Sequence, residues 1–248
     1  MRNMWQIIVG TVLAAGVGLV LYNAVGDNDA PISAGSSPVQ GETATPANQP
    51  SNIEIPASTQ ANPPTAEAEY GEIPVEVDDF VIGEATAPVT IIEYASLTCS
   101  HCAQFHNQVL PALKKGLIAS GKVQFVFRDF PLDQLAMAGS VLARCAGRDR
   151  YFAFLDVLFR DQSSWARSQD PFRALSQIAR LGGIGKDKFQ SCLGDKKLQE
   201  DILKKRLDGN QKYQVNSTPT LFINGKKFSG GLTLGQIKAV VATITPKS

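Results

Sequence analysis

The sequence predicts one α/β domain over residues 75–248, and two observations carry this prediction. A β-branched apolar run at 89–92 leads directly into a Cys-x-x-Cys pair formed by Cys99 and Cys102, and helical spacing of apolar residues follows the pair. A block at about 132–213 then shows helical patterns alone, which indicates a helical insertion between strands. We therefore expect a mixed sheet that is flanked by helices and interrupted by a helical domain.

Residues 1–25 contain an uncharged apolar run, 5–22, that is preceded by Arg2. Its length lies between that of a signal-peptide core and that of a membrane span, and the positive N-terminus predicts that the following residues lie outside the cytoplasm. Trp5 and Tyr22 bracket the run as interfacial aromatic residues do. We therefore favour an uncleaved signal-anchor over a cleaved signal peptide, for which Ala24-Val25-Gly26 offers a weak cleavage pattern.

Residues 26–74 are rich in Pro, Ala, Ser, Thr, Asn and Gln and contain few large apolar side chains. Such a segment buries too little surface to offset the entropy lost on ordering, so we expect a disordered linker. Random-coil scaling gives a linker of this length a reach of about 40 Å. The predicted domain is then free to move above a membrane surface.

The charge balance excludes one class of partner. The net charge is +1, and no basic stripe with interleaved aromatic residues is present, so no nucleic-acid partner is expected. The run Lys204-Lys205-Arg206 lies inside a helical pattern, and we interpret it as a solvated helix face.

The strand patterns follow in order along the domain. A first strand is expected at 75–82, with a turn at 83–88, and the central strand at 89–94. The next strand, 122–127, requires a crossover helix if it is parallel to the central one, and residues 100–119 supply it. Arg128 and Asp129 at its end are interpreted as a local turn or a structural ion pair.

The remaining elements are helices and one hairpin. Five helices are expected in the insertion, separated by glycines, at 135–146, 151–159, 171–181, 186–192 and 198–213. Asn224-Gly225 between two apolar runs predicts a β-hairpin, and a final helix is expected at 232–243.

The Cys-x-x-Cys pair opens the crossover helix, and this position has chemical consequences. Unpaired N–H groups and the positive end of the helix dipole favour a thiolate at Cys99, and a protonated His101 adds a second favourable charge. A stabilised thiolate makes the disulfide more oxidising. Cys102 points into the helix packing and is expected to be the resolving thiol.

Three other interpretations of the pair are weaker. A zinc site needs four ligands, whereas Cys99, Cys102 and His106 stand alone. A c-type haem needs His directly after the second Cys, where this chain has Ala103. A structural disulfide would close a very small loop and constrain the unfolded chain little. We therefore favour redox catalysis, with no metal or cofactor.

Three motifs together resemble the DsbA-like branch of the thioredoxin superfamily. They are Thr-Cys-Ser-His-Cys at 98–102, Lys-Val-Gln-Phe-Val-Phe-Arg-Asp-Phe-Pro-Leu at 122–132 and Asn-Ser-Thr-Pro-Thr at 216–220. The resemblance runs from about residue 75 to the C-terminus and implies a thioredoxin-like fold with an inserted helical domain at about 132–213. It implies a protein disulfide oxidoreductase. Ser100 departs from the proline that disulfide oxidases often have at this place.

The resemblance also implies roles for residues outside the pair. Glu93 lies in the central strand, where a carboxylate is costly unless it is paired or protonated; it would be a buried acid beneath the dithiol that accepts or relays the proton of Cys102. The alternative is a strand end that reaches solvent. Pro219 would form a cis-proline loop opposite Cys99, with Thr218 contacting substrate and sulfur; the alternative is an edge-strand proline.

Cys145 and Cys192 are the other two cysteines, and both lie in the predicted helical block. In an exported protein with an even cysteine count we expect a bridge, worth roughly 4 kcal/mol in the chain-entropy model. The resemblance likewise implies a second, non-catalytic disulfide. Two separate buried thiols and a redox-sensing pair are the alternatives.

The function expected from these residues is the introduction of disulfides into exported proteins by exchange at Cys99 and Cys102. The expected partners are folding proteins with free cysteines and, by resemblance, a membrane protein that reoxidises the pair. The expected location is the periplasm, with the domain tethered to the inner membrane or released by cleavage. The alternatives are a periplasmic reductase or isomerase, and a metal-binding protein in which His101 or His106 joins the cysteines to hold copper or zinc.

Overall fold

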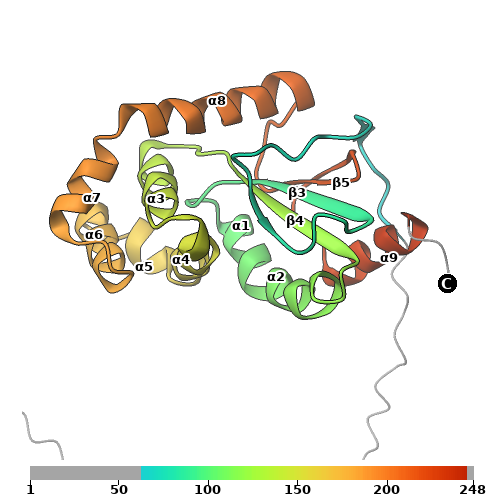
Figure 1. Ribbon diagram of the computed structural model, residues 1–248, viewed down its shortest axis with the longest axis horizontal. Helices are drawn as coiled ribbons and strands as arrows, with labels where there is room; N and C mark the ends of the chain where they lie inside the picture. Colours follow the sequence, from blue (N-terminus) through green and yellow to red (C-terminus); the bar gives the residue numbers. More distant parts are fainter. Residues whose placement is uncertain (1–62, 245–248) are drawn as a thin grey trace, which may run out of the picture. The chain divides into compact units, whose positions relative to one another are not determined.

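The computed structural model describes residues 63–244 of the chain. In this part, six strands form one mixed sheet in the order β1-β6-β5-β3-β4-β2 (Figure 1). The strands are β1 (Ala68–Glu69), β2 (Phe80–Ile82), β3 (Val89–Ala95), β4 (Val123–Asp129), β5 (Thr220–Ile223) and β6 (Lys226–Ser229). The predicted anchor or signal peptide, and most of the predicted linker, lie outside the described residues. Within 63–244, no helix has both the length and the apolar character that crossing a bilayer requires.

β3 lies inside the sheet, as predicted for the central strand. It pairs in parallel with β4 and antiparallel with β5, and six of its seven residues are buried. A strand that is covered on both faces reads as a continuous apolar run because neither face meets water. This explains why the strand reads Val-Thr-Ile-Ile, a run of β-branched residues, before Glu93 near the end that leads to the dithiol.

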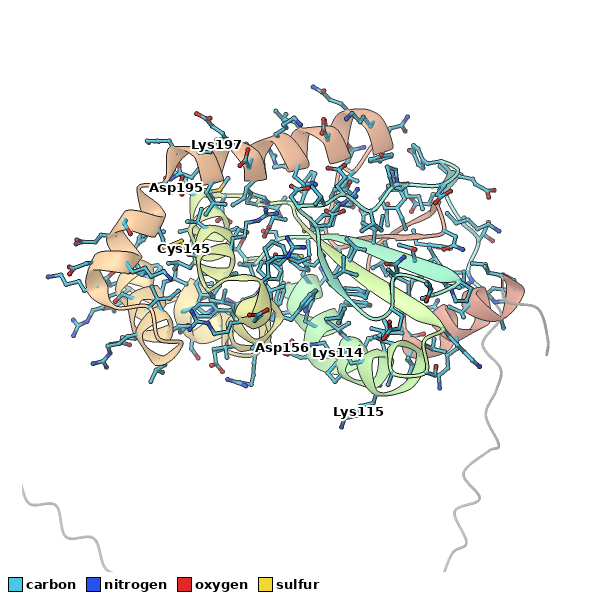
Figure 2. All side chains as sticks on the ribbon, viewed as in Figure 1. Lys114, Lys115, Cys145, Asp156, Asp195 and Lys197 are labelled. Carbon is cyan, nitrogen blue, oxygen red and sulfur yellow. A yellow bond between two sulfur atoms is a disulfide. The ribbon has the colours of Figure 1, made fainter. Side chains whose placement is uncertain are left out.

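The predicted crossover helix between β3 and β4 is confirmed, although its backbone includes two π-helical turns. It consists of α1 (Ser100–Gln104), the π-helical turn η1 (Phe105–Val109), α2 (Leu110–Leu113) and the π-helical turn η2 (Lys114–Ile118). Pro111 has no N–H to donate and lies in the first turn of α2, directly after the wide turn. Lys114 forms an ion pair of 2.9 Å with Asp156, which ties the helix to α4 (Figure 2).

The helical insertion lies at one side of the sheet, and its last helix runs across the top of the sheet in Figure 1. Its members are α3 (Gln134–Cys145), α4 (Arg148–Arg160), α5 (Gln162–Ala166), α6 (Pro171–Leu181), α7 (Lys186–Leu193) and α8 (Lys196–Tyr213). Asp133, Asp170 and Asp195 each accept a hydrogen bond from the first turn of the helix that follows, and so cap α3, α6 and α8.

The C-terminal part closes the fold as the sequence predicts. Asn224 and Gly225 both have positive φ, 44° and 79°, between β5 and β6. These are the values of a two-residue hairpin turn of the kind that Asn-Gly favours. α9 (Leu234–Ile244) follows and lies on the same side of the sheet as α1 and α2 (Figure 1).

Two expectations about the start of the domain are wrong. The folded part begins before residue 75, because β1 pairs with β6 and Ile73 is buried, both inside the segment predicted as linker. The strand expected at 75–82 is reduced to β2, and Val77 is 95% exposed. β1 is only two residues long, and its own sequence carries no strand signal. It forms because β6 offers an edge with unpaired backbone groups.

The interpretation of Lys204-Lys205-Arg206 as a solvated face is also wrong, because Lys205 is buried. Its ammonium contacts Glu76 at 2.7 Å and Asp79 at 3.3 Å. Asp79 also pairs with Arg128 at 2.7 Å, which confirms that Arg128 has a structural ion pair. This cluster holds the segment before β2 against α8 and β4, because Asp79 pairs with both buried cations and its removal would cost each of them a partner.

Candidate active site

Cys99 occupies the N-cap position of α1, where β3 and its loop turn into the helix. Its backbone is extended, with φ −80° and ψ 119°, and its carbonyl accepts the N–H of Ala103 at 3.1 Å. The sulfur therefore lies beside N–H groups that have no partner inside the helix. Cys99 is half-buried, whereas Cys102, one turn on, is fully buried, and both are free thiols.

The surroundings of Cys99 favour its thiolate. A hydrogen bond from the Cys102 side chain is the main cause that lowers the pKa of Cys99 from 9.0 to about 5. Burial acts in the opposite direction, and Thr218 and the backbone N–H groups of Cys102 and His101 add to the lowering. At neutral pH Cys99 is therefore a thiolate, which is the form that attacks disulfides and leaves from them.

Cys102 has the opposite environment. Burial is the main cause that raises its pKa well above 9.0, the hydrogen bond to Cys99 adds to this, and the negative charge of Glu93 adds further. The two thiols of the pair therefore divide the work. Cys99 is the exposed nucleophile, and Cys102 stays protonated until it resolves a mixed disulfide.

The loop before β5 faces the dithiol. The Thr218–Pro219 bond is cis, as the resemblance implied, and the Cys99 thiol donates a hydrogen bond to the Thr218 carbonyl at 3.2 Å. The Thr218 hydroxyl is buried and has no other hydrogen-bond partner, so it is the group that can donate to the sulfur once the proton has left. The expected contact of Thr218 with the Cys99 sulfur is confirmed.

Glu93 is completely buried, so the alternative of a strand end that reaches solvent is wrong. One carboxylate oxygen lies 2.8 Å from His106 Nε2, and the other has no protein partner. The effect of its charge on Cys102 places it near the resolving thiol. Its role as proton acceptor remains a prediction.

His101 contributes in a different way from the one expected. Its side chain is exposed, and it stabilises the Cys99 thiolate through its backbone N–H. The expected contribution from a protonated imidazole has no counterpart among the causes that lower the pKa of Cys99. The N–H acts in every protonation state of the ring, because it belongs to the first turn of α1.

Sequence reasoning missed a second layer of residues that fix the loop. Gln162 in α5 donates to the carbonyls of Leu97 at 2.8 Å and Cys99 at 2.9 Å. The Thr98 hydroxyl donates to Asp133 at 2.7 Å, and Asp133 caps α3. The helical insertion therefore holds the dithiol loop from one side. α5 is only one turn long, and no pattern in the sequence pointed to it.

Two clefts flank the dithiol. One, of about 340 Å³, is lined by His101, Phe105 and the loop at 231–234. The other, of about 240 Å³, is lined by Ser100, Asp133 and Gln162 among others. Because Cys99 lies between Thr98 and Ser100 at the opening of the helix, an extended chain in either cleft can bring a sulfur to it.

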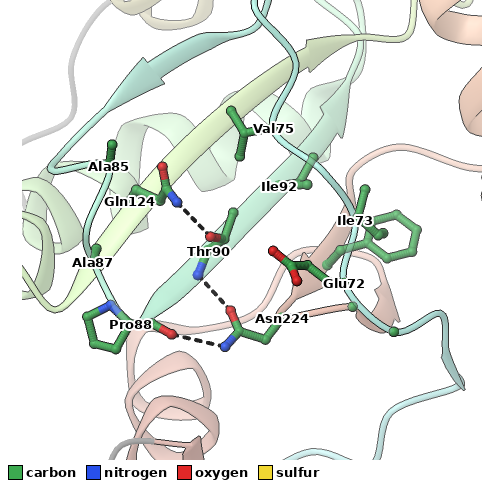
Figure 3. A pocket seen from close by; sticks show the side chains of 13 residues that line it. Glu72, Ile73, Val75, Ala85, Ala87, Pro88, Thr90, Ile92, Gln124 and Asn224 are labelled. Atoms are coloured by element: carbon green, nitrogen blue, oxygen red, sulfur yellow. Dashed lines mark hydrogen bonds between the residues drawn. The ribbon is translucent and has the colours of Figure 1, made fainter.

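A cavity of about 560 Å³ lies elsewhere (Figure 3). Thr90 in its wall accepts from Gln124 Nε2 at 2.8 Å, and its N–H donates to Asn224 at 2.7 Å. Thr90 is at the beginning of β3, whereas the dithiol follows the end of that strand. Strand length alone separates the two by about 20 Å, so this cavity takes no part in the chemistry of Cys99.

Cys145 and Cys192 form a disulfide that joins the end of α3 to α7. This is the bridge expected from the sequence, and the alternative of two separate thiols is wrong. Within residues 63–244, no three His, Cys, Asp or Glu side chains gather in a metal-binding group. His106, one of the two histidines that the metal-binding alternative offered as a ligand, is instead bound to Glu93.

Comparison with known proteins agrees with this geometry. The family model described as Thioredoxin matches residues 76–243. A Rickettsia conorii protein, named for protein-disulfide oxidoreductase activity, is 30% identical over 195 residues, which cover 78% of this chain and 70% of that protein. The crystal structure of Wolbachia pipientis alpha-DsbA1 matches with a TM-score of 0.64 and 32% identity over 68% of this chain and 92% of that one. Oxidised BdbD from Bacillus subtilis, at 23% identity and a TM-score of 0.60, covering 71% of this chain and 97% of that one, shares the fold.

Proposed function

We propose that this chain, which belongs to the thioredoxin family and is a protein-disulfide oxidoreductase, works in the oxidising direction and introduces disulfides into exported proteins. The observation that carries the direction is the low pKa of Cys99, about 5. A thiolate that is stabilised in the reduced pair makes the oxidised pair a stronger acceptor of electrons.

The exchange proceeds in two steps. A substrate thiolate attacks the Cys99 sulfur of the oxidised pair, forms a mixed disulfide and breaks the Cys99–Cys102 bond; Cys102 leaves with the electron pair and takes up a proton. A second substrate thiolate attacks the substrate sulfur, forms the new disulfide and releases Cys99 as a thiolate. Two electrons pass to the pair. Of the two protons that the substrate thiols lose, one stays on Cys102 and the other enters solvent.

The substrates in this proposal are unfolded or folding proteins with free cysteines. The Thr218 backbone beside the Cys99 sulfur and the clefts on both sides of Cys99 support binding of an extended chain. Backbone recognition accepts many sequences, which suits an enzyme that acts on many proteins.

The proposed compartment is the periplasm, with the N-terminal apolar run as its anchor or export signal. The Cys145–Cys192 disulfide supports an oxidising compartment, because such bonds persist there and are rare in the cytosol. An oxidase that works more than once needs an electron acceptor, and we propose a membrane redox protein for this role.

A trapping experiment tests the proposal. The Cys102→Ala variant, first oxidised at Cys99 with a small aromatic disulfide, is mixed with a reduced one-cysteine peptide, and the products are read by mass spectrometry after acid quenching. In parallel the oxidised wild type is mixed with a reduced two-cysteine peptide. The proposal expects a Cys99-linked adduct in the variant and a cyclised peptide with the wild type. If the reduced wild type, mixed with the cyclised peptide at equal concentration, instead reduced that peptide to completion, the proposed oxidising direction would be wrong.

A further inference from the structure

His106 is a buried titratable side chain to which the mechanism above assigns no role. His106, in η1, is 3% exposed, and its Nε2 lies 2.8 Å from Glu93. It is four residues after Cys102, about one helical turn. Its partner Glu93 acts on the resolving thiol, because the charge of Glu93 is one of the causes that raise the pKa of Cys102.

The surroundings of His106 are aromatic. Phe159 of α4 stacks on its ring at 4.0 Å between centroids, and Phe127 of β4 packs edge-on at 5.5 Å. Phe125 and Phe105 complete the shell at about 6 Å. Among the described residues, Glu93 of β3 is the only titratable side chain that forms a hydrogen bond or ion pair with the ring.

Two atoms of this pair are buried without a protein partner. They are Nδ1 of His106 and the second carboxylate oxygen of Glu93. The aromatic shell offers no acceptor for a proton on Nδ1, so in the resting pair the proton lies on Nε2 and is donated to a Glu93 carboxylate. The second Glu93 oxygen is then the atom of this pair that is open to accept a hydrogen bond or a proton from another group.

We propose that His106 is a positioning residue of the exchange reaction, whose Nε2–H keeps Glu93 ionised beside Cys102, so that the free oxygen of Glu93 can take the proton from the Cys102 thiol. This inference rests on disulfide exchange at Cys99 and Cys102. When Cys102 attacks a mixed disulfide at Cys99, its S–H bond breaks and the proton passes to the pair. The new Cys102–Cys99 bond forms, and the other sulfur leaves with the electron pair. In the reverse direction the pair returns the proton to Cys102.

Without a hydrogen-bond donor, a fully buried carboxyl favours its neutral form, because burial disfavours charge. A neutral Glu93 already carries its proton and cannot act as a base. The loss of His106 should therefore resemble the loss of the Glu93 carboxylate, although His106 touches neither sulfur. General-base assistance is typically worth 100-fold or more, so a partial loss of about 10-fold is expected.

The test separates two steps in one reaction. The reduced full-length protein is mixed with oxidised glutathione, and samples are quenched with acid and analysed by mass. In the first step Cys99 takes one glutathione, and in the second Cys102 displaces it. Only the second step removes a proton from Cys102, so the first step is an internal control.

His106→Phe removes the donor and keeps an aromatic ring, whereas His106→Gln keeps an N–H donor for Glu93 but cannot take up a proton. We expect His106→Phe to slow the second step about 10-fold at pH 7 with the first step changed less than about twofold. His106→Gln should fall between this variant and the wild type, and it covers the case in which His106→Phe does not fold. Phe159→Leu, which alters packing on the ring and leaves the pair intact, is the matched control.

A double variant distinguishes an effect of His106 through Glu93 from an effect on packing. In a Glu93→Gln background, replacing His106 should have no further effect on the second step, because the two residues act as one unit. An equal effect in both backgrounds, or wild-type rates and pH dependence in both His106 variants, would overturn the proposal. A wild type that takes up no glutathione at Cys99 would instead contradict the proposed function itself.

Discussion

The two cysteine pairs of this protein differ in almost every respect that controls sulfur chemistry. Cys99 and Cys102 are three residues apart at the opening of a helix, with one sulfur half-exposed and its pKa lowered to about 5. Cys145 and Cys192 are 47 residues apart, join two helices of the insertion, and are bonded. Cys192 is 4% exposed.

The difference shows how one chain can carry a reactive and an inert pair together. The helix N-terminus, Thr218 and the neighbouring thiol stabilise the reduced form of the first pair, which makes its disulfide easy to reduce. The second pair closes a long loop and so restricts the unfolded chain, which makes its disulfide hard to lose. The position of each cysteine pair within the fold therefore decides whether the pair is reactive or structural.

The largest expected effect is on catalysis. Cys99→Ser should abolish disulfide transfer to a reduced peptide, because the hydroxyl is a far weaker nucleophile and cannot form the mixed disulfide. The measurement is the rate of peptide oxidation under matched conditions. The double variant Cys145→Ala/Cys192→Ala is the control and should transfer at close to the wild-type rate. Disulfide transfer that is retained in Cys99→Ser and lost in Cys145→Ala/Cys192→Ala would contradict this assignment, because the second pair would then be the catalytic one.

The second effect is on stability. Removing Cys145 and Cys192 together should lower the free energy of unfolding by roughly 4 kcal/mol, as the chain-entropy model gives for a loop of this length. For a domain of this size the melting temperature should fall by about 10 °C. The measurement is thermal unfolding followed by circular dichroism. A fall in melting temperature of less than about 2 °C would show that the disulfide does not restrict the unfolded chain as the chain-entropy model assumes.

The third effect depends on pH and concerns the first pair. The folded pKa of Cys99, about 5, lies below the ordinary value of 9.0, so the unfolded reduced chain binds one more proton between these values. The stability of the reduced protein should therefore rise from pH 5 to pH 9, and the contribution should be lost as pH falls through 5. We expect the reduced protein to have a higher melting temperature than the oxidised protein at pH 7. The difference between these two melting temperatures, the gap, should narrow towards pH 4.

Thermal unfolding of both redox forms across this range measures the gap. Cys99→Ser should show no pH-dependent change of the same kind, since the serine hydroxyl does not titrate there. Thiolate absorbance near 240 nm should appear in the same pH window. A gap that stays constant from pH 4 to pH 8 would be incompatible with a thiolate stabilised at Cys99.

The smallest effect concerns the layer behind the loop. Gln162→Ala removes two hydrogen bonds to the carbonyls of Leu97 and Cys99, and a loss of about 1 kcal/mol in unfolding free energy is expected. Ser164→Ala, at an exposed position on the same helix, is the matched control. Chemical denaturation gives both values. Equal unfolding free energies for the two variants would show that water replaces the Gln162 amide without loss of stability.

Much of the site could be predicted from the sequence because its signals are local. The β-branched run gave β3, the order of strand and Cys-x-x-Cys gave the helix opening, and Asn224-Gly225 gave the hairpin. The cis-proline loop and the burial of Glu93 came from resemblance, because each depends on strands that are distant in the chain.

What could not be predicted depends on distant partners. β1 exists only against β6, and Lys205 is buried only because acidic residues 126 to 129 positions away surround it. Gln162 reaches the dithiol loop from a one-turn helix. His106 did have a signal, since its spacing from Cys102 puts both on one helix face. The sequence offered it only as a metal ligand, and its contact with Glu93 required the structure.

The most direct test of the difference between the two pairs is the reduction potential of Cys99 and Cys102. The protein is equilibrated in glutathione buffers, and free thiols at each cysteine are counted by alkylation and mass spectrometry. The account predicts a strongly oxidising pair, with a reduction potential of about −120 mV, while Cys145 and Cys192 stay bonded throughout. A value near about −270 mV, typical of thioredoxin, would contradict the claim that the site stabilises its reduced form and donates disulfides.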